Sequence, residues 1–514
     1  MSILKFFRKY HKWAGVVLTV LLVLFAISGI ILNHRDLLSR VSVNRNYLPG
    51  DYRYENWNIA AVRDMYGLSQ DSVLLYGNVG VWLTDSTVSQ FRDMNAGFPD
   101  GIDNRKIFKV LRYKQYLLAG TLFGLYGYSQ NEQKWQNIAL PVHEKNVVDL
   151  LVKGDSLMVM LRSGILLTTD MQNFRTMDLP TPYGYDNRVS LFKTLWVVHS
   201  GEIYGNVGKL IVDFAALIMI FLSVTGILLF FNRKKIKQRK AKAESQKKLK
   251  QKYRWNIKWH NKVGWITIVL LLITTFTGIF LRPPLLAMIG NVRVKKIPFT
   301  ELDTPNPWFD ILRRMIFLPD EDMFIISTSE GFYFSGDNLK TLNRFRHQPP
   351  ASVMGVTVLK NAENGALVVG SFEGLFLWDY HTGYVYDVMK QQEYIRPVKA
   401  GPPVGDFKIT GYGFDKKGRE IVFDYSHGAT GIFGKADFPE MPAEILKKSP
   451  MSLWNVALEV HTARFYKVIL GNFYILILPL TGMFTLLILI SGIVLWFKYH
   501  RKSRSAKKHI VRTE

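Results

Sequence analysis

Four long apolar runs constrain this chain most, because each is long enough to cross a lipid bilayer as a helix. A helix needs about 20 mostly apolar residues to span roughly 30 Å of hydrocarbon. The runs are Trp13–Leu32, Leu210–Phe231, Val263–Leu281 and Phe473–Phe497. Basic residues precede the first run, but it is too long for a secretory signal peptide and no small-residue cleavage site follows. We therefore expect four membrane-spanning helices.

The positive charge of the chain lies beside these runs. The formal charge is +25 over 514 residues, and +23 of it lies in residues 1–12, 232–262 and 498–514. By the positive-inside rule these segments and both termini are cytoplasmic. The segments 33–209 and 282–472 then lie outside, and we expect a bacterial inner membrane with these segments in the periplasm. The charge therefore reports topology and contact with anionic lipid headgroups, and we expect no nucleic-acid partner.

The residue types exclude several classes of site. The chain has no cysteine, which excludes disulfides, thiolate zinc sites, cysteine-ligated iron–sulfur clusters and covalently attached c-type haem. No P-loop, GxSxG, HExxH or dinucleotide fingerprint is present. Any electrons that this chain carries must therefore come from a separate donor, such as a quinol or a partner protein.

The chain is internally duplicated. The segment around His11 matches the segment around His260 at an offset of 249 residues, and the register continues through each span to Gly29 and Gly278. On a helix that turns about 100° per residue, these glycines share a line with the histidines. Glycine there lets another helix or a flat cofactor approach the backbone closely.

The even-numbered spans are duplicated as well. The segment around His199 resembles that around His461, and the alignment ends at Gly226 and Gly492 after four extra residues in the second copy. Each half is thus a helix, an external segment, a histidine-bearing segment and a second helix. Both halves cross the membrane in the same direction, so a pseudo-twofold axis would run along the membrane normal.

Four of the 11 histidines occupy these repeated positions. His11 and His260 lie at the cytoplasmic edge of the odd spans, and His199 and His461 lie at the external edge of the even spans. Neutral imidazole is a good axial ligand for haem iron, and b-type haem needs no cysteine. We expect two b haems, one held by His11 and His260 and the other by His199 and His461. Interfacial histidines without a metal are the alternative.

Two further histidines compete as ligands. His34 lies at the external end of the first span and is included among the candidate haem-binding residues, and His500 lies at the cytoplasmic end of the fourth. Their repeat counterparts are Pro283 and Lys234, so the duplication does not support them.

Several motifs resemble those of the PepSY-associated transmembrane helix family. They are His-x-x-x-Gly at His11, a span ending in Gly-Ile-Ile, Asn33-His34-Arg35 after that span, and the later His199-Ser-Gly-Glu-Ile-Tyr-Gly. Some members are bacterial inner-membrane ferric-siderophore reductases with two b haems. The resemblance implies haem at His11, His260, His199 and His461. The second copy departs from the motif, because the residues after His461 lack the Gly-Glu that follows Ser200.

The external segments 36–190 and 285–450 are expected to form short antiparallel strands. Turn glycines recur at spacings of 44, 40 and 43 residues, between Gly80 and Gly124, Gly124 and Gly164, and Gly331 and Gly374. This period is typical of β-propeller blades. We expect an all-β extracytoplasmic domain, a propeller of about six blades built from two insertions, with a pair of β-sandwiches as the alternative.

The expected architecture is a four-span α-helical membrane bundle of two repeated helix pairs with this β domain. The expected divisions are residues 1–35 (cytoplasmic N-terminus and first span), 36–190 (external β segment), 191–231 (histidine segment and second span), 232–262 (basic cytoplasmic loop), 263–284 (third span), 285–450 (external β segment), 451–497 (histidine segment and fourth span) and 498–514 (basic tail).

The leading functional hypothesis is a haem-b membrane reductase that passes electrons from the cytoplasmic side to an external acceptor, such as ferric iron in a siderophore. A non-redox membrane-anchored propeller that binds or senses a ligand for an uptake system is the alternative. A transporter is less favoured, because the spans carry few polar groups besides Lys209 and Asp213.

Overall fold

The computed structural model describes residues 3–290, 292–350, 352, 354–362, 365–395 and 405–510, with side chains from 5 to 498 within these ranges. The chain divides into two compact units. The helical unit comprises Met1–Leu38, Arg188–Asp303 and Trp454–Glu514, and the β unit comprises Ser39–Asn187 and Thr304–Leu453.

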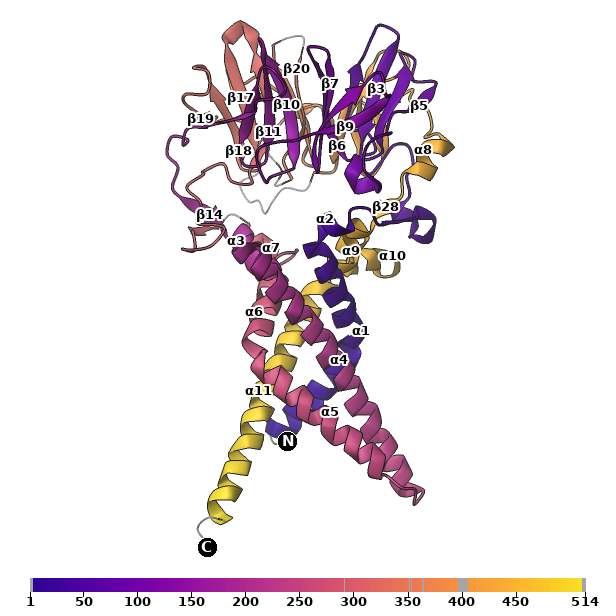
Figure 1. Ribbon diagram of the computed structural model, residues 1–514, viewed down its shortest axis with the longest axis vertical. Helices are drawn as coiled ribbons and strands as arrows, with labels where there is room; N and C mark the ends of the chain where they lie inside the picture. Colours follow the sequence, from indigo (N-terminus) through magenta and orange to yellow (C-terminus); the bar gives the residue numbers. More distant parts are fainter. Residues whose placement is uncertain are drawn as a thin grey trace. The chain divides into compact units, whose positions relative to one another are not determined.

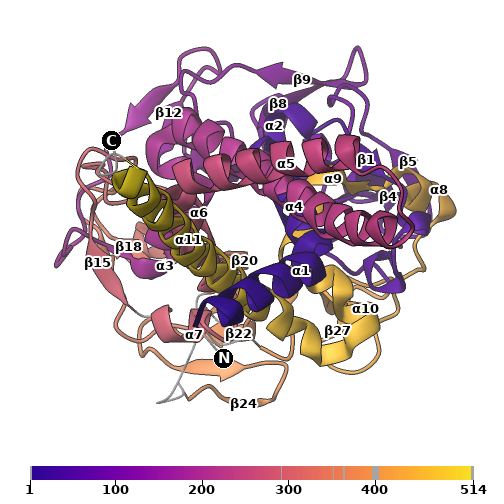
Figure 2. The ribbon, with the colours of Figure 1, turned by 90° about the horizontal axis from the view of Figure 1, so that it is seen from below.

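Long helices dominate the helical unit (Figure 1). They are α1 (Ile3–Asn33), α4 (Gly205–Ala241), α5 (Lys247–Ile266), α6 (Ile268–Ile279) and α11 (Ile477–Ile510). In the described chain, three helices are long and apolar enough to cross a membrane, or up to four if the bent pair α5 and α6 is one span. Along the bundle, α1 lies beside α11 and α4 beside α5 (Figure 2).

The third predicted span is not one straight helix. The expected run Val263–Leu281 is broken at Thr267, where α5 and α6 meet at an angle of 66°. The Thr267 hydroxyl donates to the carbonyl of Val263 at 2.9 Å, and its φ of −101° and ψ of 3° leave the helical region. Thr274 and Thr277 make the same bond inside the unbroken α6, so this bond alone does not account for the break, and hydropathy does not predict it.

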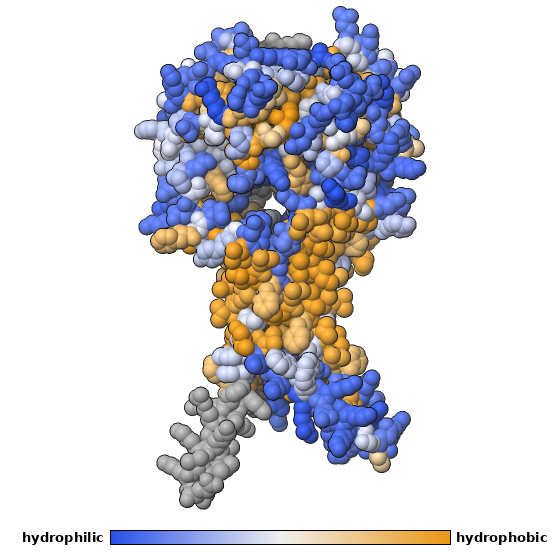
Figure 3. Space-filling model, in the orientation of Figure 1, coloured by the Kyte–Doolittle hydropathy of each residue, from blue (hydrophilic) through white to orange (hydrophobic). Residues whose placement is uncertain are grey.

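Apolar side chains cover the outside of the long helices (Figure 3). Val17, Ile266 and Val269 are 72%, 68% and 65% exposed. A soluble protein rarely leaves a continuous apolar belt in water, whereas a bilayer solvates it. This is a membrane protein whose helices contact the lipid bilayer.

Short elements complete the helical unit. They are α2 (Arg35–Leu38), α3 (Leu191–Ser200), α7 (Leu286–Ile289), α9 (Leu453–His461), α10 (Lys467–Leu470), and the paired strands β14 (Arg188–Ser190) and β15 (Arg293–Lys295). Ser190 caps α3 by accepting a hydrogen bond from the Lys193 amide, and Gly201 ends that helix with a left-handed φ of 82°. These two signals fix α3 so that its last turn carries His199.

In its described residues, the β unit consists mainly of six successive antiparallel meanders. The first meander comprises β2 (Asp64–Gly67), β3 (Ser72–Gly77), β4 (Gly80–Asp85) and β5 (Phe91–Asp93). The second comprises β6 (Ile107–Tyr113), β7 (Tyr116–Thr121), β8 (Gly124–Ser129) and β9 (Lys134–Ile138). The third comprises β10 (Val147–Lys153), β11 (Ser156–Leu161), β12 (Ile165–Thr168) and β13 (Arg175–Met177).

The other three follow in the second insertion. The fourth meander comprises β16 (Leu312–Leu318), β17 (Met323–Thr328), β18 (Gly331–Ser335) and β19 (Asn343–Arg344). The fifth comprises β20 (Val356–Asn361), β21 (Leu367–Ser371), β22 (Gly374–Trp378), β23 (Val385–Asp387) and β24 (Gln392–Glu393). The sixth comprises β25 (Ile409–Phe414), β26 (Glu420–Asp424) and β27 (Gly428–Gly431). Outside the meanders, β1 (Ser42–Val43) pairs with β28 (Met451–Ser452), and α8 is Ala443–Lys448.

Hydrophobic clusters join each meander to the next. Five clusters link consecutive meanders in chain order. A sixth links the last to the first through Phe423, Leu75 and Trp82. Strand β25 also pairs with β2 through Tyr412 and Asp64. The large β-rich region therefore shares its core in cyclic order, from residues that are far apart in the sequence.

Candidate histidine centres

The four repeated histidines meet in two pairs within the helical unit. The rings of His11 and His260 have centroids 6.3 Å apart with an interplanar angle of 86°. The rings of His199 and His461 have centroids 6.0 Å apart with an angle of 52°. The pairs are the ones that the duplication predicted, one on α1 and α5 and the other on α3 and α9.

A backbone carbonyl and two hydroxyl groups hold the first pair. His11 Nδ1 lies 3.0 Å from the carbonyl oxygen of Ile488 and 2.9 Å from Ser491 Oγ. His260 Nδ1 lies 2.8 Å from Thr225 Oγ1, which donates its own proton to the carbonyl of Phe221. These acceptors require Nδ1–H on both rings.

The second pair is held by backbone carbonyls. His199 Nδ1 donates to the carbonyl of Thr274 at 2.8 Å, and His461 Nδ1 donates to that of Phe25 at 3.0 Å. Ser28 Oγ is a further neighbour of His461 Nδ1 at 3.1 Å. The two carbonyls are repeat equivalents, because Phe25 and Thr274 are separated by the offset of the duplication.

A glycine lies against each histidine ring. A Cβ built on Gly278 would lie 2.7 Å from His199 Cε1, and one on Gly29 would lie 3.3 Å from His461 Cε1. The corresponding distances to Cε1 are 3.6 Å from Gly492 to His11 and 3.8 Å from Gly226 to His260. The glycine sites therefore differ in how much room they leave.

These contacts reveal a motif whose role the sequence reasoning missed. Each glycine lies in a Ser/Thr-Gly-Ile triplet, and each histidine contacts the triplet of a helix from the other repeat. The triplets are Ser28-Gly29-Ile30, Thr225-Gly226-Ile227, Thr277-Gly278-Ile279 and Ser491-Gly492-Ile493. Within the apolar spans the triplet occurs once for each of these four histidines, although Ser163-Gly164-Ile165 and Thr430-Gly431-Ile432 repeat it in the β segments. The two repeats are interlocked through these contacts.

The departure after His461 has a structural counterpart. Ala463 stands where the first copy has Gly201, and it too adopts a left-handed backbone with φ of 62°. This conformation costs a non-glycine residue roughly 1–2 kcal/mol. The four extra residues of the second copy form α10, after which Gly471 repeats the backbone of Gly205, with φ of 52° and 56°. His461 is placed against its triplet in spite of the altered motif.

The competing histidines lie elsewhere or outside the described side chains. His34 Nε2 lies 2.7 Å from Asp213 Oδ2, and Asn33 donates to the other carboxylate oxygen at 2.8 Å. Asp213 is buried in α4, so His34 serves as its partner. The side chain of His500 falls outside the described residues.

The profile of the PepSY-associated TM region matches residues 8–309, more than half of the chain. The chain belongs to this family. The PepSY-associated match spans His11, His199 and His260 and the first β segment. A comparison with curated protein sequences gave no match.

Solved structures resemble this PepSY-associated protein only weakly. The extracellular domain of BT4673 from B. thetaiotaomicron has a TM-score of 0.35 at 9% identity, and the match covers 72% of this chain but 32% of that one. That of BT3049 from the same organism has a TM-score of 0.33 at 10% identity, covering 73% and 40%. The designed protein Ika8 has a TM-score of 0.30 at 10% identity, covering 73% and 98%.

The donor set of each pair fits a haem iron. Each pair brings two imidazoles together with ring centroids 6.3 Å and 6.0 Å apart, and imidazole nitrogen would be a suitable ligand for haem iron. None of the four Nε2 atoms has a hydrogen-bond partner among the described residues. A Cβ on Gly15, one turn after His11, would have nothing within 4 Å, which leaves room beside that ring. The residues present therefore fit two bis-histidine haems.

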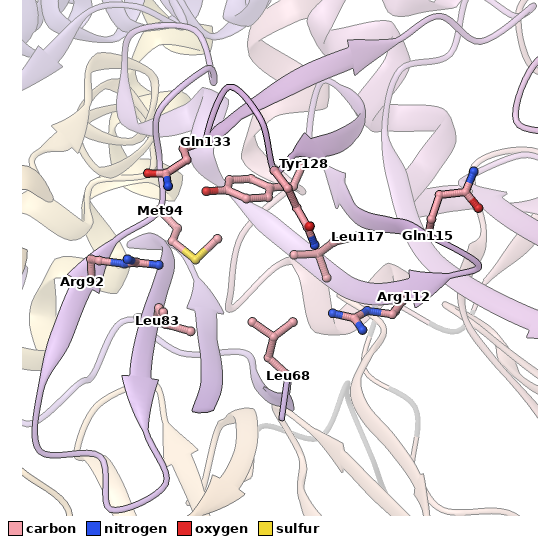
Figure 4. A pocket seen from close by; sticks show the side chains of 10 residues that line it. Leu68, Leu83, Arg92, Met94, Arg112, Gln115, Leu117, Tyr128 and Gln133 are labelled. Atoms are coloured by element: carbon pink, nitrogen blue, oxygen red, sulfur yellow. The ribbon is translucent and has the colours of Figure 1, made fainter. Parts of the chain in front are cut away.

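A separate surface pocket of about 200 Å³ lies in the β unit (Figure 4). Arg92 and Arg112 approach it from two meanders, with Leu83, Leu117 and Tyr128 between them. Both arginines are exposed to solvent. In the described part of the chain, no group of three or more His, Asp or Glu side chains could hold a metal ion.

Proposed function

We propose that this PepSY-associated protein is a haem-b membrane reductase, which carries electrons across a bacterial inner membrane to an extracytoplasmic acceptor. The acceptor proposed is ferric iron in a siderophore or a similar chelate. The observation that carries the proposal is the arrangement of the four histidines in two pairs. In each pair both Nδ1 atoms are hydrogen-bonded, and neither Nε2 atom has a hydrogen-bond partner among the described residues.

The positions of the pairs suit transfer through the membrane. His11 and Gly29, the contact of His461, are 18 residues apart on one helix, which corresponds to an axial distance of about 27 Å. One pair therefore belongs to each end of the hydrophobic region. The basic segments 1–12, 232–262 and 498–514 support a topology in which the His11–His260 pair faces the cytoplasm.

Haem iron, when bound, would supply one-electron chemistry between its ferric and ferrous states. The residues of this chain supply ligation and positioning. Acceptors at Nδ1 fix the tautomer, so the Nε2 lone pair of each ring is free to bind a metal. The glycine contacts and Nδ1 acceptors orient the rings. A quinol or a partner protein is proposed as the donor, since no nicotinamide or flavin motif is present.

The proposed topology has four spans, with the bent pair α5 and α6 counted as the third, and both termini cytoplasmic. The six meanders are proposed as blades of one β-propeller in the periplasm. The cyclic order of the six core clusters and the β25–β2 pairing support one closed ring over two separate sandwiches.

The decisive experiment is a visible absorption spectrum of the full chain, purified in detergent from cells with adequate haem supply, before and after dithionite. We expect Soret and α bands and about two b haems per chain. His11→Ala or His260→Ala should remove one haem, and His199→Ala or His461→Ala should remove the other. Protein without haem bands would overturn the proposal and leave a non-redox ligand-binding protein as the function.

A further inference from the structure

The first strands of four meanders, β2, β10, β16 and β20, bring charged residues together inside the β unit. In five of the meanders the first strand carries a register shift at its start: Ile107/Lys109, Val147/Asp149, Leu312/Arg314, Val356/Val358 and Ile409/Gly411. Such bulges re-aim side chains and often adjoin functional sites. We therefore followed the side-chain contacts that residues of these first strands make with other meanders.

Arg314 in β16 is paired with partners from two other meanders. Its Nη1 donates to the carbonyl oxygen of Phe108 at 3.0 Å and to Asp149 Oδ1 at 3.2 Å. Asp149 Oδ2 accepts from the Met315 amide at 2.9 Å, and Oδ1 also accepts from the Leu150 amide. Arg314 and Asp149 are 8% and 3% exposed. The Asp149 carboxylate is thus already used by Arg314.

Lys360 in β20 is paired in the same way. Its Nζ lies 2.6 Å from Asp64 Oδ1 and 4.8 Å from the centre of the Tyr412 ring. The other Asp64 oxygen accepts from the Tyr76 hydroxyl at 3.3 Å. The carboxylate of Asp64 is therefore also occupied.

Arg63 has no acidic partner among the residues that the structure describes. Its guanidinium lies over the ring of Phe108 at 4.8 Å, the residue whose carbonyl binds Arg314. The Arg63 side chain makes no hydrogen bond to any described residue, and its Nε is buried without a partner. Burial, and then the charge of Arg314, lower the pKa of Arg63 to about 10, so it is cationic at neutral pH. The residue as a whole is partly exposed, although its Nε is buried.

We propose that Arg63, with Arg314 beside it, binds the oxyanion of a small ligand, a carboxylate or a phosphate group. Three cations, Arg63, Arg314 and Lys360, meet two carboxylates here, which leaves one positive charge uncompensated among the described residues. Removing an unpaired cation from water costs free energy. The planar guanidinium of arginine presents hydrogen-bond donors that match the oxygens of a carboxylate or a phosphate. The site takes its ligand independently of haem.

The test is isothermal titration calorimetry of the full chain in detergent, with inorganic phosphate and with succinate as separate probes at constant ionic strength. We expect one probe to bind with one-to-one stoichiometry, and which one does so identifies the oxyanion class. Arg63→Met should weaken that binding at least about tenfold, because charge-assisted hydrogen bonds are lost. Arg112→Met, which removes an exposed arginine of the same unit, is the matched control and should bind as the parent does.

A thermal unfolding measurement adds a second readout. Without the probe, Arg63→Met should unfold at a higher temperature than the parent, since an unpaired charge is gone, and saturating probe should remove that difference. If Arg63→Met does not fold, Arg63→Lys should fold and bind more weakly than the parent. Absence of binding by both probes, an unchanged affinity in the Arg63 variants, or an equal loss in Arg112→Met would each overturn the proposal.

Discussion

The two histidine pairs come from one duplication, yet they are held in different ways. His11 has a backbone carbonyl and a serine hydroxyl at Nδ1, as His461 does, but among the described residues His260 Nδ1 has only the Thr225 hydroxyl. The glycines that face His11 and His260 leave ordinary contact distances. At His199 and His461, backbone carbonyls accept from Nδ1 and the facing glycines are closer. Backbone cannot be changed by substitution, whereas a hydroxyl can. The first pair should therefore be sensitive to the Thr225 hydroxyl, and the second pair to its glycines.

The largest effect should follow Gly278→Ala. Its Cβ would lie 2.7 Å from His199 Cε1, closer than a Cβ approaches another atom in real structures. Relief requires a shift of the His199 ring or of α6, and overpacking of this kind typically costs about 1–3 kcal/mol. We expect loss of the haem at His199 and His461, seen as about half of the haem content per chain.

Gly226→Ala is the matched control for that substitution. Its Cβ would lie 3.8 Å from His260 Cε1, which is ordinary van der Waals contact. It should retain both haems and a spectrum close to that of the parent. Two full haems in Gly278→Ala, or an equal loss in Gly226→Ala, would remove the steric distinction between the pairs.

A smaller effect is expected from Thr225→Val. Thr225 Oγ1 is the hydrogen-bond acceptor of His260 Nδ1 among the described residues, and valine keeps its shape without the oxygen. Loss of a partner that orients a ligating histidine typically weakens metal binding 10–100-fold. We expect faster haem loss to apomyoglobin and a shifted reduction potential, confined to the haem at His11 and His260.

Ser28→Ala tests the contrasting case at the other pair. His461 keeps the carbonyl of Phe25 when the Ser28 hydroxyl is removed. The rate of haem loss and both reduction potentials should stay near the parent values. A larger change in Ser28→Ala than in Thr225→Val would reverse the proposed roles of hydroxyl and backbone.

The sequence was sufficient to predict the family, the membrane helices, the β-rich segments and which histidines lie close together. Motifs, hydropathy and the internal duplication can all be recognised directly in the sequence. It did not reach the histidine acceptors, since Ser/Thr-Gly is common wherever helices pack closely. The break at Thr267 lies inside an uninterrupted apolar run, which hydropathy alone predicts as one helix. The cluster around Arg63 was also missed, because its members come from all six meanders and meet only through tertiary structure.

The smallest effect on haem should follow His34→Ala. His34 resembles a ligand in the sequence, but its Nε2 is bound to Asp213, so both haems should remain. The variant leaves the buried Asp213 carboxylate with Asn33 as its partner, which should lower stability by about 1–3 kcal/mol in thermal unfolding. His34→Ala combined with Asp213→Asn should recover much of that loss, because the unpaired charge is then absent. Loss of one haem in His34→Ala would instead indicate that His34 is a haem ligand, and the ligand assignment of one of the two histidine pairs would then be wrong.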